Sequence, residues 1–584
     1  MAAAGALCVA AHARAANACG GFFCSTQPVD QTAERVLFEV GDASVTMTTQ
    51  ISFSGKPEDF AWVLPLPEPP DPQSLQVFSQ SVLNWLDSNS GPIFPPACPG
   101  TVVGPGCPQC AQAAVGDGHV EVYLRTEVGS YDVSVIGSAD AGELVQWLRD
   151  AGYRITPAMV PYVALYAAEG MKFLALKLLD TAGVQDIRPF RFTMPGTSPS
   201  IPLRMTALAA EPEMSIVAMV LGAQRYEGKN WQTLEIPDDQ LRYSPFGGFP
   251  LQTNWSTLVA RAVDAAGGQG WVTEYAGPSA TVADALRTRL GTSTFPTPDD
   301  QLGAEQLLGL LQQYPYLTRL YSRLSAEEMT SDPVFGRSPL GEVARAHTLS
   351  RVVADIDQCS SEIDGTDPCD FSSCGAAGLC RPVTLERDPY FPVAGCACLP
   401  GATARTALAA YGRPAVVCQD GRLSFINPGD RESEDVAALP DPCAGFSCGH
   451  GQCVAMNLTP SCVCDQGFVA IGSVEADGSR RTTCVEPREP VPLSFYDGRL
   501  QALPESLPGG REVAVPSPLP ASEVAGDPGG FPMPRGETRA TQIAGGCQIA
   551  RAGASAELRW LALALAAAAV CRLRRQVGGA TTQR

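Results

Sequence analysis

One short pattern in the chain matches a hydrolase motif. Residues 445–449 read Gly-Phe-Ser-Cys-Gly, the G-x-S-x-G sequence that exposes the nucleophilic serine of many hydrolases, and His450 follows directly. The motif works when a strand precedes the serine and a helix follows it. Here Ser447 lies among closely spaced cysteines, a setting typical of a small disulfide-rich module. We therefore expect Ser447 to be structural, and we predict no catalytic residue in the chain.

A second pattern could carry redox or metal chemistry. Cys107 and Cys110 form a C-x2-C pair, and His119-Val120-Glu121 follows it. A reducible disulfide or a zinc site could be built from these residues. Zinc deaminases, however, place the H-x-E before the P-C-x-x-C, and residues 119–125 have the pattern of an ordinary strand. A structural disulfide in a loop is the favoured interpretation, and we predict no metal and no cofactor.

A third pattern could bind calcium. Residues 355–359 read Asp-Ile-Asp-Gln-Cys, similar to the leader of calcium-binding EGF modules. Cys359 lies one cysteine ahead of the module that carries the C-x-C, and Pro382 stands where that family expects Asn or Asp. Calcium binding is therefore not predicted. Asn254 and Asn457 begin glycosylation sequons, which we expect to arise by chance.

The overall charge limits the partners. The 61 Asp and Glu residues against 41 Lys and Arg give a net charge of -20, which disfavours nucleic acid as a partner. With four His and no H-E-x-x-H, zincin-type hydrolases are excluded. The acidic residues offer too many candidates for a glycosidase pair to single one out. Those in candidate positions are Glu68, Asp71, Asp238, Asp239, Asp299 and Asp300.

Both ends of the chain predict export. Ala16-Asn17-Ala18 before Cys19 is an A-x-A cleavage site, so residues 1–18 are interpreted as a signal peptide without its basic start. Near the other end, the apolar run 560–571 precedes Arg572, Arg574 and Arg575. Its twelve residues would span about 18 Å as a helix, less than the roughly 30 Å of a bilayer core.

The C-terminal segment 547–576 combines Gly-Gly-Cys547, a short spacer, the apolar run and the arginines. It resembles the MYXO-CTERM sorting tails of myxobacterial surface proteins. The resemblance implies processing or lipidation near Cys547 and display on the outer surface. An ordinary, poor transmembrane helix is the alternative. Between this tail and the last module, residues 486–546 are rich in Pro and Gly and predict an extended or disordered stalk.

Residues 19–354 are interpreted as one large α+β domain, a mixed or antiparallel sheet body followed by a helical lobe. Alternating or continuous apolar runs predict strands, and Gly41-Asp42 predicts a hairpin between the first two. The predicted strands are 35–40, 45–53, 61–67, 119–125, 131–136, 173–179 and 213–221. The predicted helices are 140–150, 157–168, 255–266, 280–290, 303–314 and 316–324.

This region resembles the bacterial domain of unknown function 2330. The likeness rests on segments distributed from end to end of the domain. They are CGGFFCSTQPVDQTAERVLF at 19–38, GKPEDFAWVLPLP at 55–67, SYDVSVIGSADAGELVQWLRDAGY at 130–153 and YLTRLYSRLSAEEMTSDPVF at 316–335. The family carries no established activity, so the resemblance implies a fold without a mechanism.

Two cysteine-rich modules follow, at 365–419 and 439–485. Each opens with Asp-Pro-Cys, has six cysteines with a C-x-C before the last loop, and places Gly after the second Cys. They resemble EGF-like modules, which implies disulfides between the first and third, second and fourth, and fifth and sixth cysteines. The implied pairs are Cys369 with Cys380, Cys374 with Cys396, Cys398 with Cys418, Cys443 with Cys453, Cys448 with Cys462, and Cys464 with Cys484.

The remaining cysteines are consistent with an oxidising compartment. Without Cys8 of the signal peptide and Cys547 and Cys571 of the tail, 18 of the 21 cysteines remain, an even number. Six of these have no predictable pairing: Cys19, Cys24, Cys98, Cys107, Cys110 and Cys359.

These features together predict an exported, membrane-anchored surface protein without enzymatic activity. Its expected role is to bind a protein or a polysaccharide at the cell envelope. Two alternatives stay open. One is an envelope hydrolase whose site lies in residues 19–354, and the other is a thiol-redox or sensory protein that uses Cys107 and Cys110.

Overall fold

The computed structural model describes most of the chain between β1 and β25. The described residues are 22–23, 31–50, 61–94, 121–138, 140–153, 155, 159–179, 186–242, 253–293, 295–347, 367–386, 388–408, 414–420, 441–456, 459–476, 478–489, 493–496 and 499–502. The expected signal peptide, residues 1–18, and the expected tail, residues 547–576, lie outside them. Among the described residues, no helix has the length and hydropathy needed to cross a membrane.

The larger of two sheets in the first part of the chain has eight strands, in both orientations. The N-terminal hairpin lies inside it, because β2 pairs in parallel with β10 and antiparallel with β3. The strand order is β12 (Gln232–Leu234), β13 (Gly270–Pro278), β14 (Tyr316–Leu324), β10 (Ala210–Gly222), β2 (Gln31–Val40), β3 (Ser44–Gln50), β9 (Phe190–Pro195) and β5 (Gln76–Val77). The predicted mixed sheet is confirmed.

The second sheet has five antiparallel strands. Their order is β1 (Phe22–Phe23), β4 (Ala61–Leu66), β8 (Lys172–Leu178), β7 (Tyr131–Gly137) and β6 (Glu121–Val128). Successive side chains of a strand point to opposite faces of the sheet, so the side chains of β8 pack into two different cores. Leu174 and Leu176 join the core shared with the eight-stranded sheet, whereas Phe173 and Ala175 pack with helices α2 (Ala141–Asp150) and α3 (Val160–Ala168).

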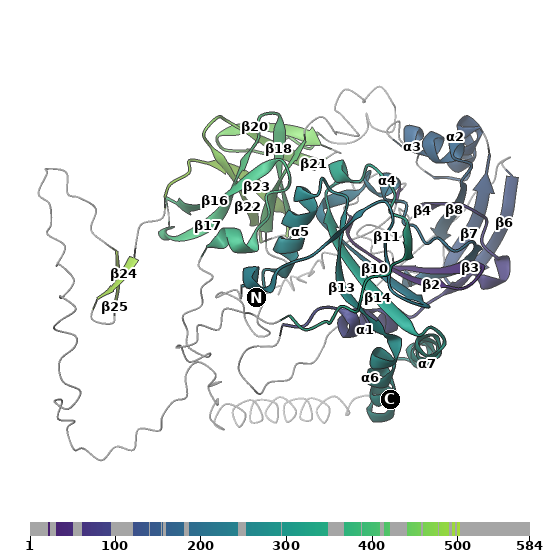
Figure 1. Cartoon of the computed structure of the whole chain (residues 1–584). Helices are drawn as coiled ribbons and strands as arrows, with labels where there is room; N and C mark the ends of the chain where they lie inside the picture. Colours follow the sequence, from purple (N-terminus) through teal and green to yellow (C-terminus); the bar gives the residue numbers. More distant parts are fainter. Residues whose placement is uncertain are drawn as a thin grey trace, which may run out of the picture. The chain divides into compact units, whose positions relative to one another are not determined.

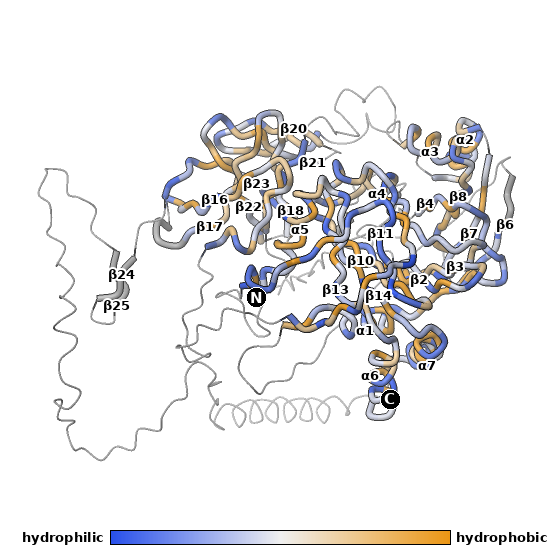
Figure 2. Tube along the Cα trace, viewed as in Figure 1, coloured by the Kyte–Doolittle hydropathy of each residue, from blue (hydrophilic) through white to orange (hydrophobic). Residues whose placement is uncertain are grey.

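The remaining helices belong to the main core. They are α1 (Gln80–Ser90), the short α4 (Leu203–Thr206), α5 (Trp255–Ala265), α6 (Ser279–Thr292) and α7 (Pro298–Gln313). Helices α6 and α7 lie side by side (Figure 1), and their leucines join α1 and α5 in the core. A two-stranded ribbon of β11 (Tyr226–Gly228) and β15 (Phe335–Arg337) completes this part. Apolar residues of β10 and β14 lie in the middle of the large domain (Figure 2).

The prediction of a helix at 316–324 was wrong. Residues 316–324 form β14, a central strand between β10 and β13, so α5, α6 and α7 alternate with strands of the same sheet. Leu317, Leu320 and Leu324 have helical spacing, which suggested a helix. Their neighbours are buried as well, because both faces of β14 are covered. A strand buried on both faces shows no alternation that would reveal it.

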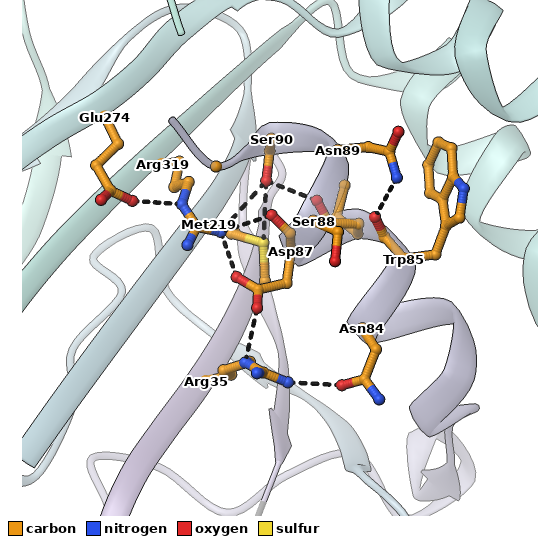
Figure 3. A network of polar contacts seen from close by, with 12 residues as sticks. Arg35, Asn84, Trp85, Asp87, Ser88, Asn89, Ser90, Met219, Glu274 and Arg319 are labelled. Atoms are coloured by element: carbon orange, nitrogen blue, oxygen red, sulfur yellow. Dashed lines mark hydrogen bonds and ion pairs between the residues drawn. The ribbon is translucent and has the colours of Figure 1, made fainter. Parts of the chain in front are cut away.

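A network of buried charges joins α1 to this sheet (Figure 3). Arg319 of β14 forms ion pairs with Asp87 of α1 and with Glu274 of β13, whose carboxylate is 2.6 Å away. Arg35 of β2 contacts Asp87 from the other side at 3.0 Å. Burial alone would raise the pKa of Asp87, but the charges of Arg319 and Arg35 outweigh it and lower the pKa. The network therefore holds its charges by mutual pairing.

Substitution of Arg319 by Met should destabilise the protein strongly. Asp87 and Glu274 would stay buried without their shared cation, at a cost of about 3–5 kcal/mol in the free energy of unfolding. Urea denaturation of the two proteins measures the difference. Arg287→Ala is the matched control, because its ion pair with Asp284 is exposed on α6 and should contribute less than about 0.5 kcal/mol. Equal losses in both variants would contradict this account.

The cysteine-rich region forms two further four-stranded sheets. One contains β16 (Gly378–Leu385), β17 (Asp388–Cys398), β22 (Val469–Val474) and β23 (Arg480–Val485). The other contains β19 (Pro414–Asp420), β18 (Ala402–Leu408), β21 (Thr459–Cys464) and β20 (Gly451–Met456). Each sheet combines one hairpin from each module, so the modules share one core. We call residues 367–489 the double module.

A short hairpin lies in the segment expected to be a stalk. Strand β24 (Leu493–Tyr496) pairs antiparallel with β25 (Arg499–Ala502). The expectation of an extended or disordered chain does not hold for these residues. The stalk beyond residue 502 lies outside the described residues.

Candidate functional site

Six disulfides hold the double module together. They follow, in both modules, the order that the EGF-like resemblance implies. The pairs are Cys369–Cys380, Cys374–Cys396, Cys398–Cys418, Cys443–Cys453, Cys448–Cys462 and Cys464–Cys484. The other cysteines of the sequence analysis, Cys19, Cys24, Cys98, Cys107, Cys110, Cys359 and Cys547, lie outside the described residues.

The two modules are related by an internal two-fold pseudo-symmetry. Cys396 of β17 pairs with Ala470 of β22, and Cys462 of β21 pairs with Ala404 of β18. These contacts correspond, because each cysteine is the fourth of its module and each alanine follows the fifth cysteine by six residues. The exchange of hairpins between modules is therefore reciprocal.

Equivalent backbone contacts repeat on both sides of the pseudo-axis. The N–H of Cys418 donates to the carbonyl of Cys374 at 2.8 Å, and the N–H of Cys484 donates to that of Cys448 at 2.7 Å. Gly375 and Gly449, which follow the second cysteines, have φ of +71° and +69°. This left-handed conformation explains why glycine recurs at that position.

One face of the double module packs against the large domain. Glu211 of β10 is buried between two arginines, 2.9 Å from Arg405 and 2.6 Å from Arg480. Gln419 donates to Glu327 at 3.2 Å, and Ser373 donates to Asp264 at 3.3 Å. Arg261 of α5 also donates to the carbonyls of Cys369 and Ser372. We call this surface the docked face.

Four carboxyl groups of the large domain gather beside the docked face: Glu213, Asp264, Glu327 and Glu328. Burial, reinforced by the charge of Glu213, raises the pKa of Asp264 to about 7, and burial raises that of Glu327 to about 7. Burial and the charge of Asp264 raise the pKa of Glu328 well above its usual value. Burial also raises the pKa of Glu213, against the opposing charges of Arg323 and Arg261. We call these groups the junction carboxyls.

The backbone beside the junction carboxyls is unusual. Glu213 is the one non-glycine residue with positive φ, +58°, among the described residues. It lies where the pairing of β10 with β2 shifts register between Ala210 and Ser215. Its backbone N–H donates to Ser325 and its carbonyl accepts from Arg323, which fixes the bulge. The bulge lies between Glu211 and the regular strand, so it sets the direction of the docking carboxylate.

The double module also carries an open groove of about 1110 Å³, which meets the docked face at Ser372. It is bordered by β17, β19 and β22, with apolar residues that include Val393, Pro414, Ile471 and Val474. The β17–β22 ladder consists of the single pair at Cys396, so the two strands leave space between them beyond that point. Val474 is 42% exposed. This groove is the candidate binding site.

The hydrolase motif has no catalytic surroundings. Ser447 lies in the turns before β20, with a strand and not a helix after it, and its hydroxyl accepts from the N–H of Gly449 at 3.4 Å. His450 stacks on Phe468, with 4.3 Å between ring centroids. The arrangement lacks the strand, turn and helix of a nucleophile elbow.

Most of the candidate carboxylates have structural contacts. Asp71 caps a short 3-10 helix. Asp299 pairs with Arg188, and the buried Asp300 accepts hydrogen bonds from Ser79 and Thr297. Glu68 and Asp239 are exposed. Among the described residues, no cluster of His, Cys, Asp and Glu could hold a metal ion.

Two contacts were not foreseen from the sequence. His347 lies 2.8 Å from Asp238, and its ring packs on Trp255. Its Nε2 is buried and has no hydrogen-bond partner in the described part of the chain, so no nucleophile completes a triad there. Asn254, the start of a sequon, is buried and bonded to the backbone of Gln240 and Arg242. Its amide is therefore closed to modification in the folded protein.

The comparisons with known proteins identify a family. Residues 13–336 match the family described as "Uncharacterized protein conserved in bacteria (DUF2330)", over more than half of the 584 residues. The chain belongs to this family. The DUF2330 match contains both sheets of the large domain and ends within β15, so the double module lies beyond it. No curated protein and no solved structure matches the chain.

The junction carboxyls predict a pH dependence of stability. Their pKa values are higher in the folded protein than in the unfolded chain, so the folded state keeps protons that the unfolded state has lost. The free energy of unfolding should therefore fall as the pH rises from about 4 to about 7. Urea midpoints at pH 5 and pH 8 measure this change.

The variant Asp264→Asn isolates one junction carboxyl. It should reduce the loss of stability between pH 5 and pH 8 by about 1 kcal/mol or more, because the amide does not ionise. Asp284→Asn is the control, since Asp284 is exposed on α6. An unchanged pH dependence in Asp264→Asn would show that Asp264 ionises normally in the folded protein.

Proposed function

We propose that this DUF2330 protein is exported to the outer surface of the cell envelope, where it binds another protein without catalysing a reaction. The observation that carries the proposal is the open groove of the double module. It is open to solvent, combines aliphatic side chains with polar and charged ones, and is built on a scaffold fixed by six disulfides. Exposed apolar surface on a rigid scaffold is typical of protein-binding sites.

The disulfides support the extracellular location. Twelve cysteines in six bridges persist in oxidising compartments and are reduced in the cytosol. The A-x-A site before Cys19 supports cleavage of a signal peptide. Anchoring through Cys547 or through the apolar run 560–571 is part of the proposal.

The placement of polar groups favours binding over catalysis. Arg319, Asp87 and Glu274 form a closed network, and Asp300 contacts two hydroxyls that cap helices α1 and α7. The junction carboxyls have shifted pKa values, but they lie beside the docked face, where a substrate would have to displace the double module. Half of the residues that line the groove are aliphatic.

Surface labelling and cell binding test this function. Intact producing cells treated with a membrane-impermeant biotin reagent should yield the biotinylated chain. The purified, oxidised full chain should bind to cells from which its gene has been deleted, and protease treatment of those cells should remove the binding. Labelling only after lysis would contradict export, and binding that survives the protease but is lost after glycosidase treatment would indicate a polysaccharide ligand.

A further inference from the structure

We infer that the groove binds an extended segment of a partner protein, apolar in its middle and basic at its ends, as an added β-strand. This inference rests on the proposed binding function and names the chemistry of the partner. It follows from comparing the groove with the docked face, because the pseudo-symmetry of the double module makes the two surfaces equivalent.

Equivalent positions can be matched by their distance from the fifth cysteine of each module. Arg405 of β18 corresponds to Ile471 of β22, and Gln419 of β19 corresponds to Val485 of β23. Arg405 and Gln419 contact the large domain, whereas Ile471 and Val485 line the groove. The groove is therefore the symmetry counterpart of a surface that already binds a folded polypeptide.

The burial of the two sides agrees with this correspondence. Arg405, Thr406 and Ala407 of β18 are buried, with 6%, 3% and 2% of their surface exposed. The equivalent residues of β22, Ile471 to Ser473, are only partly buried, and Val474 beyond them is exposed. One copy of the surface is covered and the other is uncovered.

The side chains of the two copies require different occupants. On the docked face, Arg405 and Arg480 bind the carboxylate of Glu211. Their equivalents in the groove are Ile471 and Pro414, which offer no charge to a carboxylate. Burial of apolar side chains from the partner is the favourable contact at these positions.

The charges at the groove define the ends of the partner segment. Asp367, Glu386 and Glu475 line it together with Arg481, and Arg488 outside the lining lies 3.6 Å from Glu386. The lining thus carries more negative than positive charge, opposite to the arginines of the docked face. Lys or Arg residues flanking an apolar stretch match these carboxylates.

The backbone at the groove suits a strand. The β17–β22 ladder has no pair beyond Cys396 among the described residues, and the groove lies between residues 392–394 of β17 and residues 471–474 of β22. Unpaired strand edges hold N–H and C=O groups ready to bond an extended chain. Addition of a strand supplies backbone hydrogen bonds, and alternate side chains of the added strand can enter the apolar lining.

Synthetic peptides test the inference on the purified, oxidised full chain. The probe is a fluorescein-labelled peptide of alternating Val and Thr with two Lys at each end. One comparison peptide replaces the Lys with Glu, and another differs from the probe only by Pro in place of the middle Thr. Fluorescence anisotropy should show at least tenfold tighter binding of the Lys peptide than of either comparison peptide.

Variants locate the binding. Val474→Arg should weaken binding of the Lys peptide at least tenfold, because it places a cation and extra bulk in the groove. Leu379→Arg adds the same side chain at a 58% exposed leucine of β16 outside the groove, and should leave binding within twofold. A non-reducing peptide map that contains the six bridges of the double module shows that each variant is folded there.

Three results would overturn the inference: Lys and Glu peptides that bind within twofold of each other, a Leu379→Arg variant as weak as Val474→Arg, or no binding of any peptide. The cell-binding assay separates this failure from that of the proposed function. If the full chain binds cells and Val474→Arg binds them equally well, the function stands and the groove is not its site. If the full chain binds no cells, the proposed function fails independently of the peptide result.

Discussion

The reciprocal contact between the fourth cysteine of one module and an alanine of the other organises the double module. A module of this size cannot bury a core of its own, and disulfides or association must compensate. Here both operate, because the exchanged hairpins surround one cluster in which Cys396 and Cys462 are almost fully buried. The same arrangement creates two equivalent outer faces, one covered by the large domain and one exposed.

The large domain buries charge in two different ways. Around Arg319, each charge has a partner of opposite sign, so burial and ionisation coexist. Beside the docked face, Asp264 and Glu328 are close to other carboxyls. Proton uptake removes their charge and with it the free-energy cost of their burial. The first arrangement keeps α1 on the sheet at any moderate pH, whereas the second makes the surroundings of the docked face sensitive to pH.

The sequence contained the local features of the fold but not the long-range ones. Strands such as 61–66 and helices such as 255–265 follow from apolar periodicity, and the disulfides are those that the EGF-like resemblance implies. Strand 316–324 was missed because Leu317 and Leu320 have helical spacing in a segment buried on both faces. The groove could not be predicted, because nothing in the spacing of Cys396 indicates that its strand meets Ala470 of another module.

The pseudo-axis also bears on the origin of the double module. Contacts that are reciprocal between two copies of one unit are those of an isologous homodimer. The tandem repeat therefore has the architecture of such a dimer on one polypeptide. Because the chain connects Asp420 to Asp441, the two halves associate within one molecule, at a high effective concentration. Each half contributes one arginine to the docked face and one of their apolar equivalents to the groove, so divergence of the joined halves allows one face to hold an internal neighbour while the other stays exposed.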